Sequence, residues 1–234
     1  MARISRKSLK KDEIRDELAG SVGYLVEHRN QVIIAAALAI AIGAGLAFYL
    51  GHRRTQRAEA RKALQDAIEL FHGQVTTEPR IGMISFTTTI ERRTRTTEAF
   101  ENVKQQLPGT PEVDAAEYYL ALLDVEQEKY QEAQQKLETA IQCDDAEIAA
   151  VARLALAEVY GRLEKDSEAR EQYQYLVDHP TRMVPKERAQ LALARFLIPH
   201  EPQRSKEILN ELVQKPGALG AAATAAQREL PAGS

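Results

Sequence analysis

The sequence predicts an all-α protein in which an N-terminal transmembrane helix is followed by a right-handed solenoid of helical hairpins. Three observations lead to this fold class. Alanine and leucine are abundant, whereas aromatic residues make up 6% of the chain and tryptophan is absent, which favours helices over sheets. One long run near the N-terminus is apolar and free of charge. Beyond it, short helical segments alternate with proline and glycine, and small residues recur in them at a regular interval.

The apolar run covers residues 32–50, which read VIIAAALAIAIGAGLAFYL. At ~1.5 Å per residue this helix would be about 28 Å long, close to the ~30 Å hydrocarbon core of a bilayer. A buried core helix is the alternative, but such a helix is rarely apolar on every side over its whole length. Secretory signal cores are shorter, about 7–15 residues, and 31 residues precede this run. We therefore predict an uncleaved transmembrane helix over residues 32–51.

The flanks of this run bear on its orientation. Residues 1–31 form a basic tail with a short amphipathic helix, and they hold seven Lys or Arg, against five in residues 51–70. The residues nearest the run favour the opposite orientation, but a basic tail resists translocation whereas long domains cross largely regardless of charge. We expect the tail on the inner side and the C-terminal domain on the outer side of a bacterial inner (cytoplasmic) membrane, which places that domain in the periplasm.

Small residues recur at every fourth position of the same run. This spacing lays a smooth stripe along one helix face, which lets another helix approach closely. The alternative is that alanine is simply an apolar filler here. The residues predicted to form the packing face are Ala35, Ala39, Gly43 and Ala47.

Residues 55–230 form the predicted repeat domain, and one segment in it departs from helical patterning. Residues 73–95 read GQVTTEPRIGMISFTTTIERRTR and combine β-branched residues with Pro79 and two glycines. We predict a loop insertion over 73–95, either without a function of its own or acting as a small flap.

An internal repeat organises the rest of this domain. Ala133 aligns with Ala169 at an interval of 36 residues, and the same shift places the pair Leu120-Ala121 over Leu156-Ala157. A step of 34 residues back from Ala133 reaches Ala99, and a step of 36 forward from Ala169 reaches Ser205. In a helix–turn–helix repeat the two helices cross closely and need small residues at the crossing.

Residues 152–180 resemble a tetratricopeptide repeat. They contain the pair Leu156-Ala157, an aromatic residue at Tyr160, then Ala169, Tyr173 and a closing Pro180. Residues 115–145 are similar but carry Asp124 where the repeat expects an aromatic residue, and residues 187–216 depart further through Pro199 and Ser205.

The layout of the chain resembles a bacterial family of single-span tetratricopeptide-like proteins that includes the ancillary subunit of the Sec translocon. The resemblance implies a cytoplasmic tail, one anchor in the lipid bilayer and a helical domain in the periplasm. It also implies a non-catalytic, chaperone-like scaffold that binds client polypeptides and the machinery of protein export or envelope assembly. The alternative is a structural assembly protein whose repeats face the cytoplasm and whose span oligomerises.

Catalytic and cofactor motifs are missing from the sequence. The five histidines are scattered, and neither a zinc motif, a phosphate-binding loop nor a nucleophile elbow occurs. Cys143 is interpreted as a packing residue, and Asp144-Asp145 as a turn that caps the following helix. We expect neither an enzyme, a metal, a cofactor nor a small-molecule substrate, and the net charge of −3 gives no indication of a nucleic-acid partner.

The partner-binding surface is expected on the concave side of the solenoid, which the first helix of each hairpin lines. Tyr118 and Tyr119 point about 100° apart on a helix, so one is expected to pack inward and the other to meet a ligand. The lysine–asparagine carboxylate clamp of some tetratricopeptide domains is not favoured, because its places hold Tyr118 and Leu122. The predicted set is Tyr118, Tyr119, Leu122, Glu158, Arg162, Arg188 and Arg195.

Overall fold

The structure is a computed structural model that describes residues 29–78, 82–106, 108 and 110–231. The amphipathic helix predicted within residues 1–31 lies outside the described residues except for its last three positions. The chain divides into two compact units, Met1–Thr55 and Gln56–Ser234.

Helix α2 (Arg29–Phe71) is 43 residues long and contains the whole apolar run as well as the first helix of the second unit. Large apolar side chains on its N-terminal part are exposed, among them Ile40 at 71% and Phe48 at 78%. Over the residues that the structure describes, no helix is long and apolar enough to cross a membrane.

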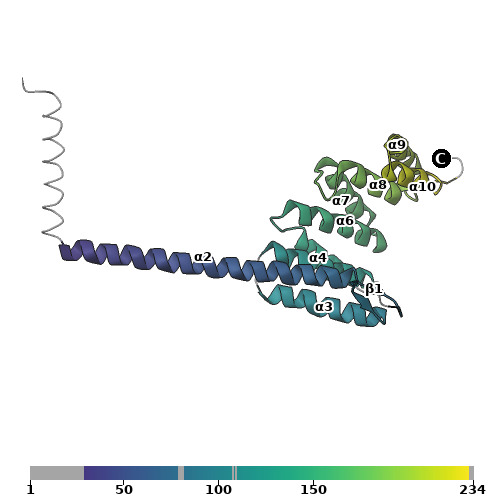
Figure 1. Cartoon of the computed structure of the whole chain (residues 1–234). Coiled ribbons are helices and arrows are strands. Elements are labelled where there is room, and N and C mark those ends of the chain that lie inside the picture. The colour runs from purple at the N-terminus through teal and green to yellow at the C-terminus, as the bar shows by residue number, and fades with distance from the viewer. Residues whose placement is uncertain (1–28, 79–81, 107, 109, 232–234) are drawn as a thin grey trace, which may run out of the picture. The chain divides into compact units, whose positions relative to one another are not determined.

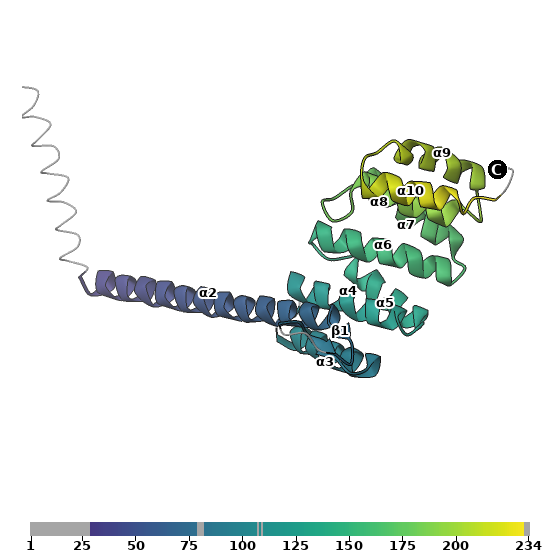
Figure 2. The same ribbon diagram turned by 45° about the vertical axis from the view of Figure 1, so that its right-hand side comes forward.

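The second unit is a succession of helical hairpins, as the colour sequence from blue to yellow shows in Figures 1 and 2. From α3 onwards each helix packs on the next along the chain, and α4 also contacts α6 and α8 contacts α10. The end of α2 packs with α3 and α4 in one apolar cluster. After the end of α2, the helices are α3 (Thr89–Gln106), α4 (Pro111–Val125), α5 (Tyr130–Ala140), α6 (Ala146–Arg162), α7 (Asp166–Asp178), α8 (Lys186–Leu197), α9 (Pro202–Val213) and α10 (Ala218–Gln227). The prediction of an all-α repeat domain is confirmed.

The second helix of every hairpin buries the same pattern of residues, at positions i, i+4 and i+7. This pattern places a small or hydroxyl-bearing residue at the first position of each triplet, and the three residues share one helix face. The buried triplets are Thr96, Phe100 and Val103 in α3; Ala133, Leu137 and Ala140 in α5; Ala169, Tyr173 and Leu176 in α7; and Ser205, Leu209 and Leu212 in α9.

This pattern corrects the register of the first hairpin. The small residue that corresponds to Ala133 is Thr96, at an interval of 37 residues, whereas Ala99 is only half-buried on the flank of α3. The predicted interval of 34 residues was wrong because α3 is longer than α5. Helix α3 ends ten residues after Thr96, whereas α5 ends seven residues after Ala133, and this difference of three residues lengthens the interval from 34 to 37.

The two hydroxyl-bearing residues at this position have their hydrogen bonds satisfied. Thr96 Oγ1 donates to the carbonyl oxygen of Arg92 at 2.7 Å, and Ser205 Oγ donates to that of Ala194 at 2.8 Å. Since a buried hydroxyl is tolerated when it is paired, threonine and serine can replace alanine at a helix crossing.

The segment predicted as a loop over 73–95 is shorter in the structure, because α3 begins at Thr89. Thr88 Oγ1 accepts a hydrogen bond from the Glu91 amide at 3.0 Å, and Glu91 Oε2 accepts one from the Thr87 amide at 3.1 Å. These reciprocal bonds satisfy amide groups at the helix start, much as in a capping box. The loop prediction overlooked this signal within the run of threonines.

The remaining part of the insertion contains two short parallel strands, β1 (Gln74–Val75) and β2 (Ser85–Phe86). Phe86 is 2% exposed, and its ring lies so close to Gly73 that a Cβ atom there would sit 2.4 Å from a ring carbon. Glycine is therefore required where α2 turns into β1. Residues 79–81, including Pro79, lie outside the described part of the insertion.

The C-terminal helix α10 closes the last hairpin. Ala223 and Ala226 are fully buried and pack in one cluster with Leu209, Leu212 and Ala194. A terminal helix of this kind covers the apolar face that the last repeat would otherwise expose.

Glu147, in the first turn of α6, ties that helix to the connection between α7 and α8. Its carboxylate accepts hydrogen bonds from the Met183 amide at 2.8 Å and from Arg182 Nε at 3.1 Å. The Met183 amide bond is the main cause that lowers the pKa of Glu147 to about 2, with the Arg182 side chain adding to it.

Replacing Glu147 with glutamine is expected to lower the melting temperature at pH 7 by about 2–4 °C. Because the folded-state pKa is depressed, the charged carboxylate stabilises the fold above its ordinary pKa of 4.5, and this contribution is lost as the pH falls towards 2. Thermal melts monitored by circular dichroism should therefore show that the difference in melting temperature between the wild-type chain and the Glu147→Gln variant becomes smaller below about pH 4.5. Glu132→Gln, in the first turn of α5, is the matched control. A difference that widens in acid would contradict this account.

Candidate partner-binding groove

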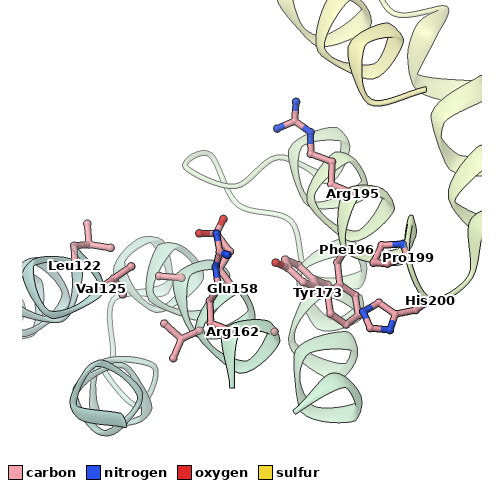
Figure 3. Close-up of a pocket in the computed structure, with 12 residues that line it drawn as sticks. Leu122, Val125, Glu158, Arg162, Tyr173, Arg195, Phe196, Pro199 and His200 are labelled. Carbon is pink, nitrogen blue, oxygen red and sulfur yellow. The ribbon is translucent and has the colours of Figure 1, made fainter. Parts of the chain in front are cut away.

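A groove of about 470 Å³ opens in the second unit between the first helices of three successive hairpins (Figure 3). Its volume falls in the range of small-ligand and peptide-side-chain sites, about 300–1,000 Å³. The lining residues are Leu122 and Val125 from α4; Ala155, Glu158, Val159, Gly161 and Arg162 from α6; Tyr173 from α7; Arg195 and Phe196 from α8; and Pro199 and His200 after α8.

The local sequence explains why these side chains share one space. Leu122 and Val125 are three residues apart on α4, and Glu158 and Arg162 are four apart on α6, so each pair occupies one helix face. Figure 3 shows Glu158 and Arg162 side by side, with the rings of Tyr173 and Phe196 on the other side of the cavity.

Four of the seven residues predicted for partner binding line this groove, namely Leu122, Glu158, Arg162 and Arg195. The structure places Tyr118, Tyr119 and Arg188 outside the lining. Arg188 is exposed on α8, where its guanidinium donates to the carbonyl oxygen of Met183 at 2.8 Å.

The two adjacent tyrosines have different surroundings. Tyr119 stacks on Phe100 with ring centroids 5.0 Å apart and meets Phe71 edge-on at 5.2 Å, so it belongs to the core between α2, α3 and α4. Tyr118 packs towards the next hairpin, and burial raises its pKa to about 12. Both tyrosines therefore pack against apolar clusters, Tyr119 within the first hairpin and α4 and Tyr118 towards the next hairpin.

Three lining residues with aromatic rings, Tyr173, Phe196 and His200, were not among those that the sequence predicted for the partner-binding surface. Tyr173 is 4% exposed, and its ring lies 5.5 Å from that of Phe196, which stacks on His200 at 4.9 Å. His200 Nδ1 lies 3.3 Å from a carboxylate oxygen of Asp166. Val125 could have been found from its spacing to Leu122, whereas Tyr173 and His200 reach the groove from outside the first helices and only the tertiary structure brings them there.

The groove has a distinctive balance of charge. The side chain of Glu158 is exposed, but the surrounding groove partly desolvates its carboxylate, and this desolvation raises its pKa. The positive charges of Arg188 and Arg162 act in the opposite direction and lower the pKa. Across the described residues, Arg162, Arg188 and Arg195 have no carboxylate within ion-pair distance, whereas Arg61, Arg92 and Arg170 each pair with a glutamate. Two guanidinium groups without a carboxylate partner, those of Arg162 and Arg195, therefore line the groove.

The predicted helix-packing face on α2 can be described only in part. The side chain of Ala35 lies outside the described residues, and Ala39, Gly43 and Ala47 are exposed. A Cβ atom added at Gly43 would meet nothing within 4 Å.

The remaining sequence motifs have structural roles. Asp145 caps α6, since its carboxylate accepts hydrogen bonds from the amides of Glu147 at 2.9 Å and Ile148 at 3.3 Å, which confirms the predicted cap. Cys143 donates to the Asp145 carbonyl oxygen, and burial raises the pKa of its thiol. In the part of the chain that the structure describes, no cluster of three or more His, Cys, Asp or Glu side chains could hold a metal.

Comparison with known proteins places this architecture in a family. The model of the tetratricopeptide repeat-like domain matches residues 23–180, which include α3 to α7. No curated protein and no solved structure matches the chain.

Proposed function

Because this chain belongs to the family of tetratricopeptide repeat-like domains, whose members are typically non-catalytic protein-interaction modules, we propose that it is a scaffold that binds a partner polypeptide in the groove between α4, α6 and α8. The observation that carries this proposal is the lining of the groove. Apolar side chains and unpaired guanidinium groups from three hairpins meet there. Aromatic residues and arginine contribute disproportionately to protein interfaces.

A cross-linking experiment tests the groove. A photo-reactive amino acid at Leu122, inside the groove, is expected to capture partner proteins in cells, whereas the same residue at Gln203, exposed on α9, should capture few. In the chain that carries the photo-reactive residue at position 122, the additional substitution Arg162→Ala should reduce the amount of cross-linked partner. Capture that is equally strong from both positions would place binding elsewhere and end this proposal. Tyr119 is left unchanged in this design because it belongs to the core.

The second part of the proposal concerns the membrane. Residues 32–51 act as a single-pass anchor in a bacterial inner membrane, with the basic tail in the cytoplasm and the repeats in the periplasm. The uncharged run 32–50 supports this, and so does the exposure of large hydrophobic side chains on α2, for which contact with lipid is more favourable than contact with water. Among the described residues they are Ile33, Ile34, Leu38, Ile40, Ile42, Leu46, Phe48, Tyr49 and Leu50.

Membrane extraction tests the anchor. The full-length chain is expected to remain in the membrane fraction after carbonate and high-salt washing. The double variant Ile40→Arg and Ile42→Arg should release much of it, because each arginine at the centre of a span costs about 2.5–3.5 kcal/mol. Ile90→Arg, at an apolar residue on α3 that is 67% exposed, is the matched control and should stay bound. A wild-type chain recovered mostly in the soluble fraction would refute the anchor.

The cellular role and topology complete the proposal. A periplasmic domain with this groove would serve as a chaperone-like accessory that holds polypeptides near the machinery of protein export or envelope assembly. A compartment-specific reporter fused after Ser234 should be active in the periplasm. Activity only in the cytoplasm would favour the alternative, a structural assembly protein that oligomerises through its span. The exposed small residues Ala39, Gly43 and Ala47 support that second candidate.

A further inference from the structure

The hydroxyl group of Tyr173 faces the groove without a partner. The residue is 4% exposed, and its ring is fixed between α7 and α8 by contact with Phe196. Its hydroxyl end is directed into the cavity in Figure 3, towards the side on which Glu158 and Arg162 lie, and the charge of Glu158 acts on it. Among the described residues no hydrogen-bond partner of this hydroxyl is found. By contrast, Tyr160, which is not a lining residue, donates its hydroxyl to Glu138 at 2.9 Å.

Cationic side chains also line the groove, and the guanidinium of Arg195 is directed away from Tyr173 in Figure 3. Arg162 and Arg195 line the groove, and Glu158 is the one carboxylate among the lining residues, so the lining carries a net positive charge. Arg188 adds a third positive charge close enough to act on Glu158. A hydroxyl donor and guanidinium groups together suit an acceptor with negative charge, because charge-assisted hydrogen bonds are the strongest that side chains form.

Apart from the imidazole of His200, the rest of the lining is apolar. Leu122, Val125 and Val159 form one wall, and Phe196 and Pro199 contribute to the other. A ligand that carried only charge, such as inorganic phosphate, would leave these walls in contact with water. An apolar side chain beside the charge would cover them, which is favourable because apolar surface is removed from water.

We infer that the groove selects polypeptide segments in which an acidic side chain stands next to large apolar ones. The carboxylate accepts a hydrogen bond from the Tyr173 hydroxyl and pairs with Arg162, while the apolar neighbours lie against Leu122, Val125 and Phe196. Arg195 supplies attraction at the rim. This inference rests on the proposed function, since it specifies the chemistry of the partner that the same groove takes.

Peptide binding to the full-length chain in mild detergent tests the inference. The probes are fluorescein-labelled, C-terminally amidated peptides of glycine and serine with a central Glu-Phe-Leu-Glu, Gln-Phe-Leu-Gln, Lys-Phe-Leu-Lys or Glu-Ser-Ser-Glu, and fluorescence anisotropy gives the dissociation constants. The Glu-Phe-Leu-Glu peptide is expected to bind about tenfold more tightly than the glutamine peptide, as one charge-assisted hydrogen bond would supply. This preference should diminish as salt is raised.

Two pairs of variants assign the preference to named groups. Tyr173→Phe removes only the hydroxyl, and Arg162→Gln removes the guanidinium with its charge, so each should reduce the preference for glutamate over glutamine severalfold. Tyr160→Phe and Arg204→Gln are the matched controls, since neither residue lines the groove, and both should leave the preference unchanged.

The outcomes separate this inference from the proposed function. Equal binding of the glutamate and glutamine peptides would overturn the acidic preference and leave peptide binding in the groove intact. Tighter binding of the lysine peptide would overturn it as well, because Glu158 would then dominate the field. Equal binding of the Glu-Ser-Ser-Glu and Glu-Phe-Leu-Glu peptides would overturn the apolar half. Failure of all peptides, together with no capture from position 122, would overturn both proposals.

Discussion

Replacing Phe100 with alanine is expected to destabilise the repeat domain by about 3–5 kcal/mol, because a large buried aromatic side chain leaves a cavity that its surroundings fill only in part. Phe100 is 0% exposed, stacks on Tyr119 at 5.0 Å and lies 6.5 Å from Phe71. It therefore joins α2, α3 and α4. Urea denaturation monitored by circular dichroism measures the change in the free energy of unfolding.

The control for Phe100 lies on the same helix. Ile90→Ala removes an apolar side chain that is 67% exposed and should change stability by no more than about 0.5 kcal/mol. A loss below about 1 kcal/mol for Phe100→Ala would mean that the first hairpin, which the insertion interrupts, is loosely packed. A separate early transition would mean that this hairpin unfolds independently of the others.

Replacing Ala169 with leucine is expected to cost about 1–3 kcal/mol, because the extra methylene groups have no room at a helix crossing. Ala169 is 0% exposed and lies in one cluster with Ala157 of the preceding helix. The same change at Ala222, a half-buried position in α10, should cost less. The measurement is again urea denaturation of the two variants beside the wild-type chain.

The outcome of this pair tests the repeat register as a whole. Ala169 and its counterparts Thr96, Ala133 and Ser205 are all fully buried. If Ala169→Leu and Ala222→Leu lowered the free energy of unfolding by the same amount, the small residues would not define the helix crossings. The alignment of the hairpins would then have to be rebuilt on the larger residues of each triplet.

Asp124 illustrates how a departure from the repeat pattern can be accommodated. The equivalent residue one repeat later, Tyr160, reaches Glu138 of α5 through its hydroxyl. Asp124 instead forms an ion pair with Lys136 of α5, and its carbonyl oxygen accepts from the Lys129 amide at 2.9 Å. Asp124 thus links the two helices of its own hairpin, whereas Tyr160 links α6 to the preceding hairpin. The sequence showed the departure but not the partner.

The turns within the two central hairpins are more alike than their sequences suggest. Glu128 and Glu164 both have φ 59°, and they stand 36 residues apart. A left-handed backbone conformation is uncommon for residues other than glycine. The two turns share this conformation although neither has a glycine that would indicate it in the sequence. Turn positions of this kind are found from the repeat interval and not from local composition.

Much of the architecture could be predicted because helical patterning is local. The helices and the cap at Asp145 follow from spacings of one to four residues within a single segment. The small residues at Ala133, Ala169 and Ser205 follow from the repeat interval of 36 residues, because the hairpins that this interval crosses are alike in length. Errors arose where the repeat interval had to be counted across a helix or loop whose length the sequence does not show. Ala99 was chosen in place of Thr96 because the length of α3 was not known, and the start of α3 was missed because its capping threonines stand among other β-branched residues.

The sequence by itself determined that this chain is a helical repeat with a long apolar segment near its N-terminus, because both properties depend on residue order along one helix at a time. Only the tertiary structure decided that Tyr119 is a core residue, and that Tyr173, Phe196 and His200 complete a groove with Leu122 and Arg162. A helix fixes the angle between its own side chains but not which face its neighbours cover. That choice depends on how successive hairpins pack, and it brings residues as far apart as Leu122 and His200 into one binding surface.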